Sequence, residues 1–221
     1  MAQNGELHTF GPKSDIIKCM GNTVGNLTQL QKSVIIGCIL GDGYLRQLPG
    51  RKDAFLEINH SIKAKDYVDW KYSVLKNICL SPPKKRKIDE KRTGYRFFTR
   101  QHPEITRLYR EFYQEGKKKI PVGLELNSLI LAVWFMDDGS KTKKGDVYLN
   151  SQQFNLRDQK RLLHALRKIG IRGRLNKDKK YYRIRIYKES VPRFLKIIKP
   201  YILPSLSYKV IGLDPVETHQ K

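Results

Sequence analysis

Two aspartates, Asp42 and Asp138, stand in sequence contexts that suit them to metal-dependent chemistry. Each lies at the end of an apolar stretch and directly before a glycine: residues 35–43 read IIGCILGDG, and residues 131–139 read LAVWFMDDG. The apolar runs predict two buried helices, and glycine is common just beyond a helix end because it adopts the left-handed conformation without a clash. An aspartate in the last turn costs about 0.3–1 kcal/mol, because it faces the negative end of the helix dipole.

A bound divalent cation would turn this cost into a gain. Two carboxylates on two packed helix ends, beside carbonyl groups without helical partners, form an all-oxygen ligand set of the kind that suits Mg²⁺. The alternative is a pair of buried helices that end in ordinary Asp-Gly turns, which are common. A single copy of the motif would favour that alternative, whereas its repetition in a matching context favours a metal site.

The composition indicates a polyanionic partner. Lys and Arg total 44 against 21 Asp and Glu, which gives a formal net charge of +23 and a pI near 10.0. This excess goes beyond what solubility requires. No apolar run approaches the roughly 18 residues of a membrane span, so no membrane partner is expected. The three cysteines form no CxxC pair, the histidines lack metal-ligand spacing and no signal peptide opens the chain. These features favour a reducing compartment and argue against structural zinc.

The chain is expected to be a duplication. After each motif helix, the sequence predicts two strands, a helix, two further strands and a helix that begins with a proline. Thr28 and Gln31 predict a capping box at the first motif helix, and Asn127 or Ser128 is expected to cap the second. Ser190 is expected to cap the final proline-started helix. Residues 1–25 are polar and glycine-rich, and are interpreted as an appendage with one short helix that begins at Ser14.

Four hairpins follow from this plan, and the second hairpin of each half is basic. Their turns are predicted, in chain order, at Pro49-Gly50, Thr93-Gly94, Lys144-Gly145 and Lys179. In the last strand, side chains alternate so that Arg183, Arg185 and Tyr187 share one face. A basic sheet face is often only a solvated surface, but its recurrence in both halves favours DNA contact. The residues predicted to contact DNA are Arg46, Lys84, Lys85, Arg86, Arg96, Arg100, Lys141, Lys143, Arg172, Arg174, Arg183, Arg185 and Tyr187.

The two motifs resemble those of the LAGLIDADG homing endonuclease family, in its single-chain form with two motifs. The resemblance spans nearly the whole chain, through the segments GPKSDIIK, LSPPKK, KKKIP, WFMDDG, LNSQ and SYK. It implies an α+β fold of two pseudo-twofold-related αββαββα domains, at residues 26–120 and 121–221. Each domain would carry a curved antiparallel sheet that saddles the major groove, and the two would pack through the motif helices.

The resemblance also implies a function. It identifies the chain as a site-specific endonuclease that hydrolyses phosphodiester bonds on both strands of a long asymmetric DNA duplex and leaves 3′ overhangs. Mg²⁺ is the implied cofactor, with Mn²⁺ expected to substitute, and the protein is expected to be monomeric. The implied location is a mitochondrion or chloroplast in a eukaryote, or otherwise the bacterial cytoplasm.

Residue roles carry over from the family position by position. Asp42 and Asp138 take the catalytic and metal-binding positions; Gly41 and Asp137 precede them as carbonyl ligands, although Asp137 can also be read as a polar bystander. Lys118 and Lys209 match basic positions near the scissile phosphates, where they would favour the charged transition state. For Lys118 the alternative is a solvated lysine run at residues 117–119.

Polar residues are expected to organise solvent beside the acids. Gln152 is assigned this role in the second half, and Asn59 or His60 in the first, although a merely structural hydrogen bond suits His60 equally well. The family motif usually has a small residue at its third position, which Gly37 satisfies and Val133 does not. We therefore expect Gly37 to face a larger side chain on the other motif helix.

A second hypothesis is non-enzymatic. Relatives of this fold also serve as intron RNA maturases or as inactive nucleic-acid-binding proteins, and positive charge alone does not distinguish RNA from DNA. The pair of aspartates distinguishes an endonuclease from a protein that only binds nucleic acid, because a binding protein has no need for two aspartates at unfavourable helix ends. The sequence therefore favours the endonuclease.

Overall fold

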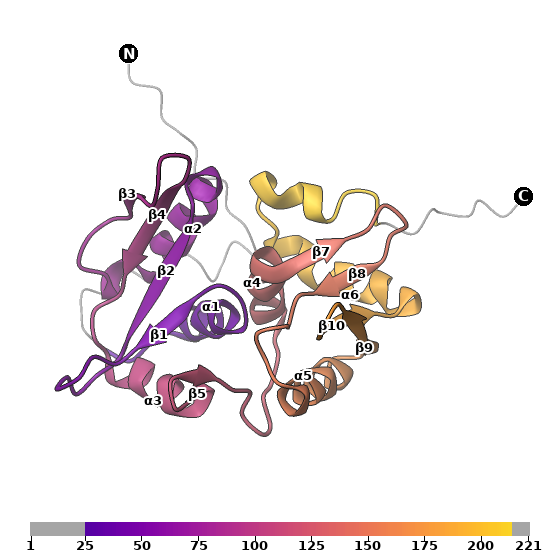
Figure 1. Cartoon of the computed structure of the whole chain (residues 1–221), viewed down its shortest axis with the longest axis horizontal. Coiled ribbons are helices and arrows are strands. Elements are labelled where there is room, and N and C mark those ends of the chain that lie inside the picture. The colour runs from indigo at the N-terminus through magenta and orange to yellow at the C-terminus, as the bar shows by residue number, and fades with distance from the viewer. Residues whose placement is uncertain (1–24, 214–221) are drawn as a thin grey trace, which may run out of the picture.

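The computed structural model describes residues 25–213, which form two halves of similar design lying side by side (Figure 1). The short helix predicted at Ser14 lies outside these residues. Within them, no helix combines the length and the apolar character needed to cross a bilayer.

The first half has the predicted order of helices and strands. Its elements are α1 (Gln29–Leu40), β1 (Tyr44–Arg46), β2 (Phe55–Ser61), α2 (Lys65–Leu75), β3 (Lys84–Lys87), β4 (Thr93–Phe98) and α3 (Pro103–Phe112). The four strands pair antiparallel in the order β1-β2-β4-β3. A short hairpin of β5 (Tyr113–Gln114) and β6 (Lys117–Lys118) follows α3.

The second half repeats this order. Its elements are α4 (Ser128–Asp138), β7 (Gly139–Lys141), β8 (Val147–Leu149), α5 (Leu156–Lys168), β9 (Gly173–Asp178), β10 (Tyr181–Ile186) and α6 (Val191–Ile198). The sheet order β7-β8-β10-β9 matches that of the first half, again antiparallel throughout. The predicted α+β fold of two αββαββα units is thus confirmed, while the boundary between residues 120 and 121 stays a prediction.

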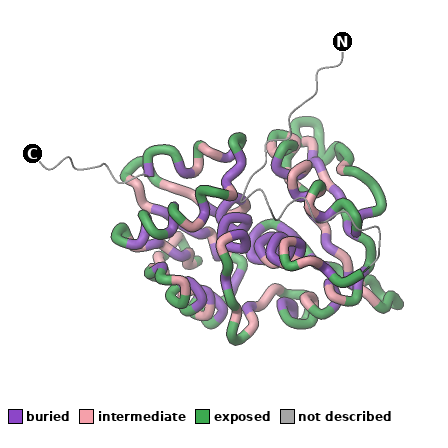
Figure 2. The backbone as a smooth tube through the Cα atoms, turned by 180° about the vertical axis from the view of Figure 1, so that it is seen from behind, coloured by how far each residue is buried: buried purple, intermediate pink, exposed green. Residues whose placement is uncertain are grey.

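The motif helices α1 and α4 pack against each other at the centre of the molecule, where Figure 2 shows buried backbone. A Cβ added to Gly37 would lie 2.6 Å from the Cβ of Val133, so the two backbones approach closely at this point. The glycine faces the larger residue of the partner helix, as expected. Residues 34–40 of α1 and 129–136 of α4 are apolar on all sides, and protein surrounds nearly all of them.

Local capping chemistry accounts for both motif helices. The side chain of Thr28 accepts a hydrogen bond from the N–H of Gln31, whose side chain accepts the N–H of Thr28, which completes the predicted capping box. Asn127 Oδ1 accepts the N–H of Ile130 at 2.8 Å. Ser190 occupies the predicted N-cap position of α6, but its hydroxyl makes no capping bond: it accepts the N–H of Arg172 at 3.0 Å instead and ties α6 to the start of β9.

Three of the four predicted turns are confirmed by left-handed backbone at Gly50, Gly145 and Lys179. The turn predicted at Thr93-Gly94 is wrong, because both residues lie in β4. Asp89 makes the turn instead, since its carboxylate accepts the backbone N–H groups of residues 91 and 92, as in an Asx-turn. A Cβ added at position 94 would lie 2.9 Å from Oδ1 of Asn59, the end of an exposed side chain.

Candidate active centre and nucleic-acid interface

The C-terminal ends of α1 and α4 meet at one point. A Cβ added to Gly41 would lie 2.4 Å from the Cβ of Asp137, so only glycine allows this approach. Beside the contact opens a hollow of about 710 Å³ that receives both motif aspartates. It is lined by Gly41, Asp42, Tyr44, Gly116, Lys117, Lys118, Asp138, Asn150, Gln152, Gln153 and Asn155.

Two lysines bind the two helix ends in the same way. Lys118 Nζ donates to the carbonyl oxygen of Gly41 at 2.7 Å, and Lys209 Nζ donates to that of Met136 at 2.6 Å and of Asp137 at 3.2 Å. Each ammonium satisfies carbonyl groups that lack helical partners and opposes the negative end of the dipole. Lys118 is therefore not part of a solvated run. Burial lowers its pKa to about 8, although Asp138 acts in the opposite direction, and burial also lowers the pKa of Lys209.

Both motif aspartates hold their protons more strongly than a free carboxyl group. Burial, together with the charge of Asp137, raises the pKa of Asp42. Burial and the charge of Asp42 raise the pKa of Asp138 to about 7. Carboxylates that are destabilised by burial and by each other are stabilised by a shared cation, so the donor chemistry of this centre fits a divalent metal.

Asp137 turns its carboxylate away from the hollow and into the domain interface. Its side chain is fully buried; Oδ1 lies 2.7 Å from Nζ of Lys71, and Oδ2 accepts the backbone N–H of Asp42 at 3.2 Å. Burial opposes the charge of Lys71, but the Asp137 carboxylate outweighs it and the pKa of Lys71 is raised. The sequence analysis missed Lys71. A signal for it existed in the sequence, since Lys71 lies three residues after Val68 and four before Leu75, and so shares the buried face of α2 with these apolar residues.

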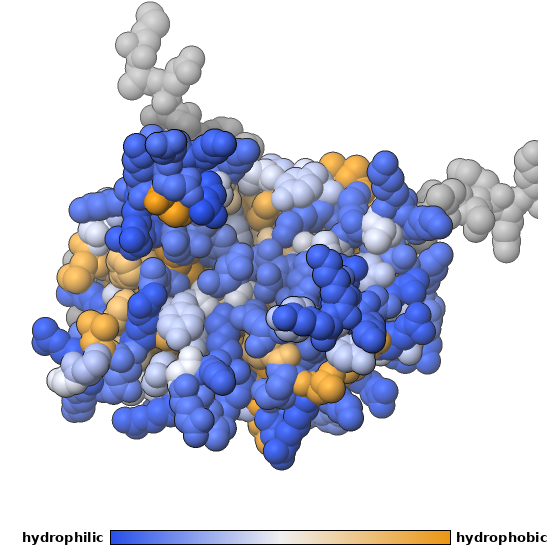
Figure 3. All heavy atoms as spheres, in the orientation of Figure 1, coloured by the Kyte–Doolittle hydropathy of each residue, from blue (hydrophilic) through white to orange (hydrophobic). Residues whose placement is uncertain are grey.

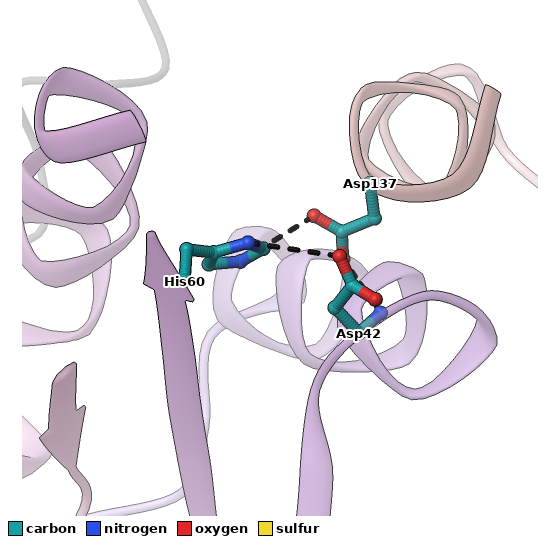
Figure 4. A group of neighbouring side chains, drawn as sticks. All are labelled: Asp42, His60 and Asp137. Atoms are coloured by element: carbon teal, nitrogen blue, oxygen red, sulfur yellow. Dashed lines mark hydrogen bonds and ion pairs between the residues drawn. The ribbon is translucent and has the colours of Figure 1, made fainter. Parts of the chain in front are cut away.

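His60 comes into the centre from β2, as Figure 4 shows. Its Nδ1 lies 3.6 Å from Oδ2 of Asp42, and its Nε2 lies 3.7 Å from Oδ1 of Asp137. Burial and the charge of Lys71 lower its pKa to about 4, so the imidazole is neutral at neutral pH. Asn59 points to the other face of the sheet and is exposed. Of the two residues considered for the first half, His60 is therefore the one that faces the acids.

Gln153 connects the two motifs, and the sequence analysis did not single it out. Its Nε2 donates to the carbonyl oxygens of Leu40 at 3.0 Å and Gly41 at 3.2 Å, and lies 3.3 Å from Oδ2 of Asp138. Gln152 lines the same hollow, but its amide donates to Asp178 at 3.3 Å. Both glutamines lie in the turn after β8, where strand alternation no longer indicates which of them points to the acids.

Most of the predicted DNA-contacting residues in the strands lie on the sheet faces opposite the core. In antiparallel pairs, facing residues point to the same side of a sheet. Arg96 faces both Asn59 and Lys84, and in the second sheet Arg185 faces both Tyr148 and Arg174. This register places Arg46, Lys84, Arg86 and Arg96 on one polar face, and Arg174, Arg183 and Arg185 on the other.

Two of the basic strand residues differ from this expectation. Lys85 faces Tyr95, and Lys141 faces Val147, so both point to the core side of their sheets. Lys141 also donates to the carbonyl oxygen of Ile211, which holds it against the C-terminal segment. Their position at a sheet edge keeps these long side chains partly accessible, but they are not part of the polar faces.

The remaining candidates flank the strands. Arg100, Lys143 and Arg172 are exposed, Tyr187 is half-buried, and Arg172 pairs with Glu189 at 3.1 Å. The surface in the view of Figure 3 is predominantly hydrophilic.

Acidic neighbours hold the two arginines of β10 in place. Arg185 pairs with Asp146 at 2.6 Å, and the Arg183 guanidinium stacks over the Tyr148 ring at 4.1 Å, with Nε 3.9 Å from Asp178. Both arginine side chains retain 26% exposure. The guanidinium groups are therefore oriented before any partner binds, which reduces the entropy lost on binding.

A model of the LAGLIDADG DNA endonuclease family matches residues 32–194, a span that includes both motifs, both sheets and both motif aspartates. The chain belongs to this family. Membership accounts for the repeated helix ends, because the motif that names the family is the one that closes α1 and α4.

Individual relatives agree with this assignment. The probable intron-encoded endonuclease 1 of Wickerhamomyces canadensis is 30% identical over 223 residues, which cover 93% of this chain and 94% of that protein. The cytochrome b mRNA maturase bI2 of Saccharomyces cerevisiae is 32% identical over 212 residues, but the match spans only 50% of the maturase. Among solved structures, the homing endonuclease I-WcaI bound to its DNA recognition sequence has a TM-score of 0.78 and 29% identity, and the match covers 91% of this chain and 94% of that one.

Proposed function

We propose that this LAGLIDADG chain is a site-specific homing endonuclease that acts as a monomer. It would hydrolyse phosphodiester bonds on both strands of a long, asymmetric DNA duplex and leave 3′ overhangs. One observation carries the proposal: two motif aspartates stand at the ends of two packed helices, and each helix end is bound by its own lysine. The likeness to a DNA-bound homing endonuclease supports the choice of substrate.

Asp42 and Asp138 would hold Mg²⁺, and Mn²⁺ is expected to substitute. The carbonyl groups of Gly41 and Asp137 would add further oxygen donors once Lys118 and Lys209, which bind them in this structure, turn toward the phosphate. When bound, the divalent cation supplies Lewis-acid stabilisation of negative charge on the phosphate oxygens. The ammonium groups of Lys118 and Lys209 add positive charge at fixed positions beside that phosphate and favour the charged transition state. Gln153 and Gln152 would orient water in the hollow, and the two polar sheet faces would bind the duplex.

The decisive experiment is cleavage of a plasmid library with a randomised insert, with and without Mg²⁺. We expect a small set of related sequences to be linearised only in the presence of the metal, with ends that sequence as 3′ overhangs. Asp42→Asn serves as the inactive control. Selective binding of related sequences without any cleavage, in Mg²⁺ or Mn²⁺, would contradict the endonuclease and favour an inactive binder.

A second candidate function rests on the similarity to a protein named as a cytochrome b mRNA maturase. The same basic surface would then bind intron RNA. A splicing assay on the host intron with Asp42→Asn and Asp138→Asn combined separates the two, because a maturase would remain active without its acid pair. The names of the yeast relatives, as intron-encoded or cytochrome b proteins, also support a mitochondrial origin for this chain.

A further inference from the structure

The charges at the centre of the molecule do not follow its twofold symmetry. Gly41 precedes the first motif aspartate, whereas Asp137 occupies the same position in the second motif. This extra carboxylate is fully buried, close to two other acids, and would be strongly unfavourable without a partner.

The partner comes from the other half of the molecule. Lys71 projects from α2, and its side chain is fully buried beside Asp137, 66 residues away in the sequence. The ammonium also lies 3.0 Å from Nε2 of His60 and 4.1 Å from the centre of the Tyr67 ring. The ammonium group of Lys71 therefore has a carboxylate, an imidazole and an aromatic ring as partners inside the protein.

Strand register identifies the equivalent residues in the second half. Ile58 faces Phe97 in the first sheet, and Leu149 faces Ile184 at the equivalent place in the second, so Ile58 corresponds to Leu149. Two residues further along each chain, His60 therefore corresponds to Ser151. The same sequence offset superimposes the buried positions of α2 on those of α5. It pairs Lys71 with Leu162, and both side chains are fully buried. One half thus has a lysine and the other a leucine at the same place in the fold.

The ammonium also determines how His60 meets the acids. A lysine ammonium only donates, so Nε2 of His60 is the acceptor and the ring proton of the neutral tautomer lies on Nδ1. That Nδ1 faces Oδ2 of Asp42 at 3.6 Å. Asp42, His60 and Asp137 have ligand atoms within 4.8 Å of one another, as a metal site would require, but Lys71 already supplies the positive charge there.

These contacts all act on Asp42. Oδ2 of Asp137 accepts the backbone N–H of Asp42, and Nδ1 of His60 faces its carboxylate, whereas Asp138 is contacted by Gln153 instead. We propose that Lys71, paired with Asp137 across the domain interface, is a positioning residue for Asp42 alone, so that the pair supports cleavage of one DNA strand more than the other. This inference rests on the proposed endonuclease function.

Two substitutions together test the proposal without an unpaired buried charge. Lys71→Met with Asp137→Asn removes both charges and keeps the approximate shapes, whereas either change alone leaves one ion buried without its partner. We expect the double variant to melt closer to the wild type than either single variant. The control is Leu162→Met, which changes the equivalent residue of the other half and conserves its volume.

The readout is the cleavage rate of each strand, measured on a supercoiled plasmid and on an end-labelled duplex. In the double variant we expect nicked circles to accumulate, because cleavage of one strand falls by about 10- to 100-fold while the other changes little, a loss typical of a small misplacement of a catalytic group. Leu162→Met should leave the ratio of the two rates unchanged. A folded double variant that cuts both strands in the wild-type ratio would overturn the positioning role. A wild type that fails to cut would instead overturn the proposed function, and this inference with it.

Discussion

Lys118 donates from Nζ to the carbonyl oxygen of Gly41 at 2.7 Å, which places a cation at the end of α1 beside the hollow. Lys209 makes the matching contact at the end of α4. The two ammonium groups therefore complete the helix ends, and under the proposed function they would also place positive charge beside the phosphate.

Replacement of Lys118 by methionine should lower the rate of DNA cleavage strongly. Loss of one fixed charge at a transition state typically costs about 10²–10³ in rate. Because Lys118 has one contact among many at the interface, we expect DNA affinity to fall much less. Single-turnover cleavage and equilibrium binding on the same duplex measure the two effects. The matched control is Lys119→Met, which alters the half-buried neighbour that does not line the hollow and should leave the rate near that of the wild type.

Gly37→Ala tests the close approach of α1 and α4. The added methyl group would lie 2.6 Å from the Cβ of Val133, so the helices must separate. We expect the free energy of unfolding to fall by about 1–3 kcal/mol, as for an overpacked core. Denaturant unfolding measures this change. Val133→Gly in the same chain removes the Cβ that the new methyl group would meet and should restore part of the loss, and strictly additive effects of the two changes would argue against a direct clash.

Asp138 should make the metal-free protein less stable as the pH rises from about 4 to about 7, whereas the lowered pKa of His60 acts in the opposite direction. The pKa of Asp138 is 3.8 in its ordinary state and about 7 in the fold, so the folded protein retains the proton over this range. Stability from this group is fully present below about pH 4 and is lost as the pH passes the folded pKa. In EDTA, Asp138→Asn should therefore become steadily more stable relative to the wild type between these pH values. A pH-independent difference between the two proteins would contradict the raised pKa.

Arg183→Ala and Arg185→Ala should distinguish base readout from phosphate contact. If these side chains read guanine edges, each change should cost about 1–3 kcal/mol and relax preference at one or two base pairs. If they contact only phosphate, affinity should fall evenly across sequences and the salt slope should decrease by about one per residue. Affinities for the cognate site and its single-base variants, at several salt concentrations, separate the cases.

Lys141→Ala is the matched control for these arginines, because its side chain points to the core face and binds the Ile211 carbonyl. It should change binding much less than either arginine substitution. If Lys141→Ala weakens binding while both arginine changes leave it intact, the polar face of β10 is not the DNA-binding surface.

Local features of this fold could be predicted from the sequence. The capping box at Thr28, the cap at Asn127 and the left-handed turns at Gly50 and Gly145 depend on residues a few positions apart, and the structure confirms them. The turn before Gly94 was predicted wrongly, because a glycine inside a strand carries the same sequence signal as a glycine that forms a turn.

Long-range pairings could not be predicted in the same way. Lys71 and Asp137 lie on different halves, and nothing near either residue indicates the other; only the presence of a lysine on an apolar helix face was visible in advance. Which of Gln152 and Gln153 contacts the motif aspartates depends on the backbone path of the turn after β8. In both cases, tertiary geometry decides which of several suitable residues reaches the acids.

The most direct test of the proposed mechanism is the cleavage rate of Asp42→Asn and Asp138→Asn, measured together with affinity for the same target. Asparagine keeps the shape of each side chain but removes the charge that would hold the metal. We predict that neither variant makes a double-strand break, while both bind the target at least as tightly as the wild type, since a negative charge facing phosphate has been removed. Either variant cutting both strands at the wild-type rate would contradict the role of these two aspartates.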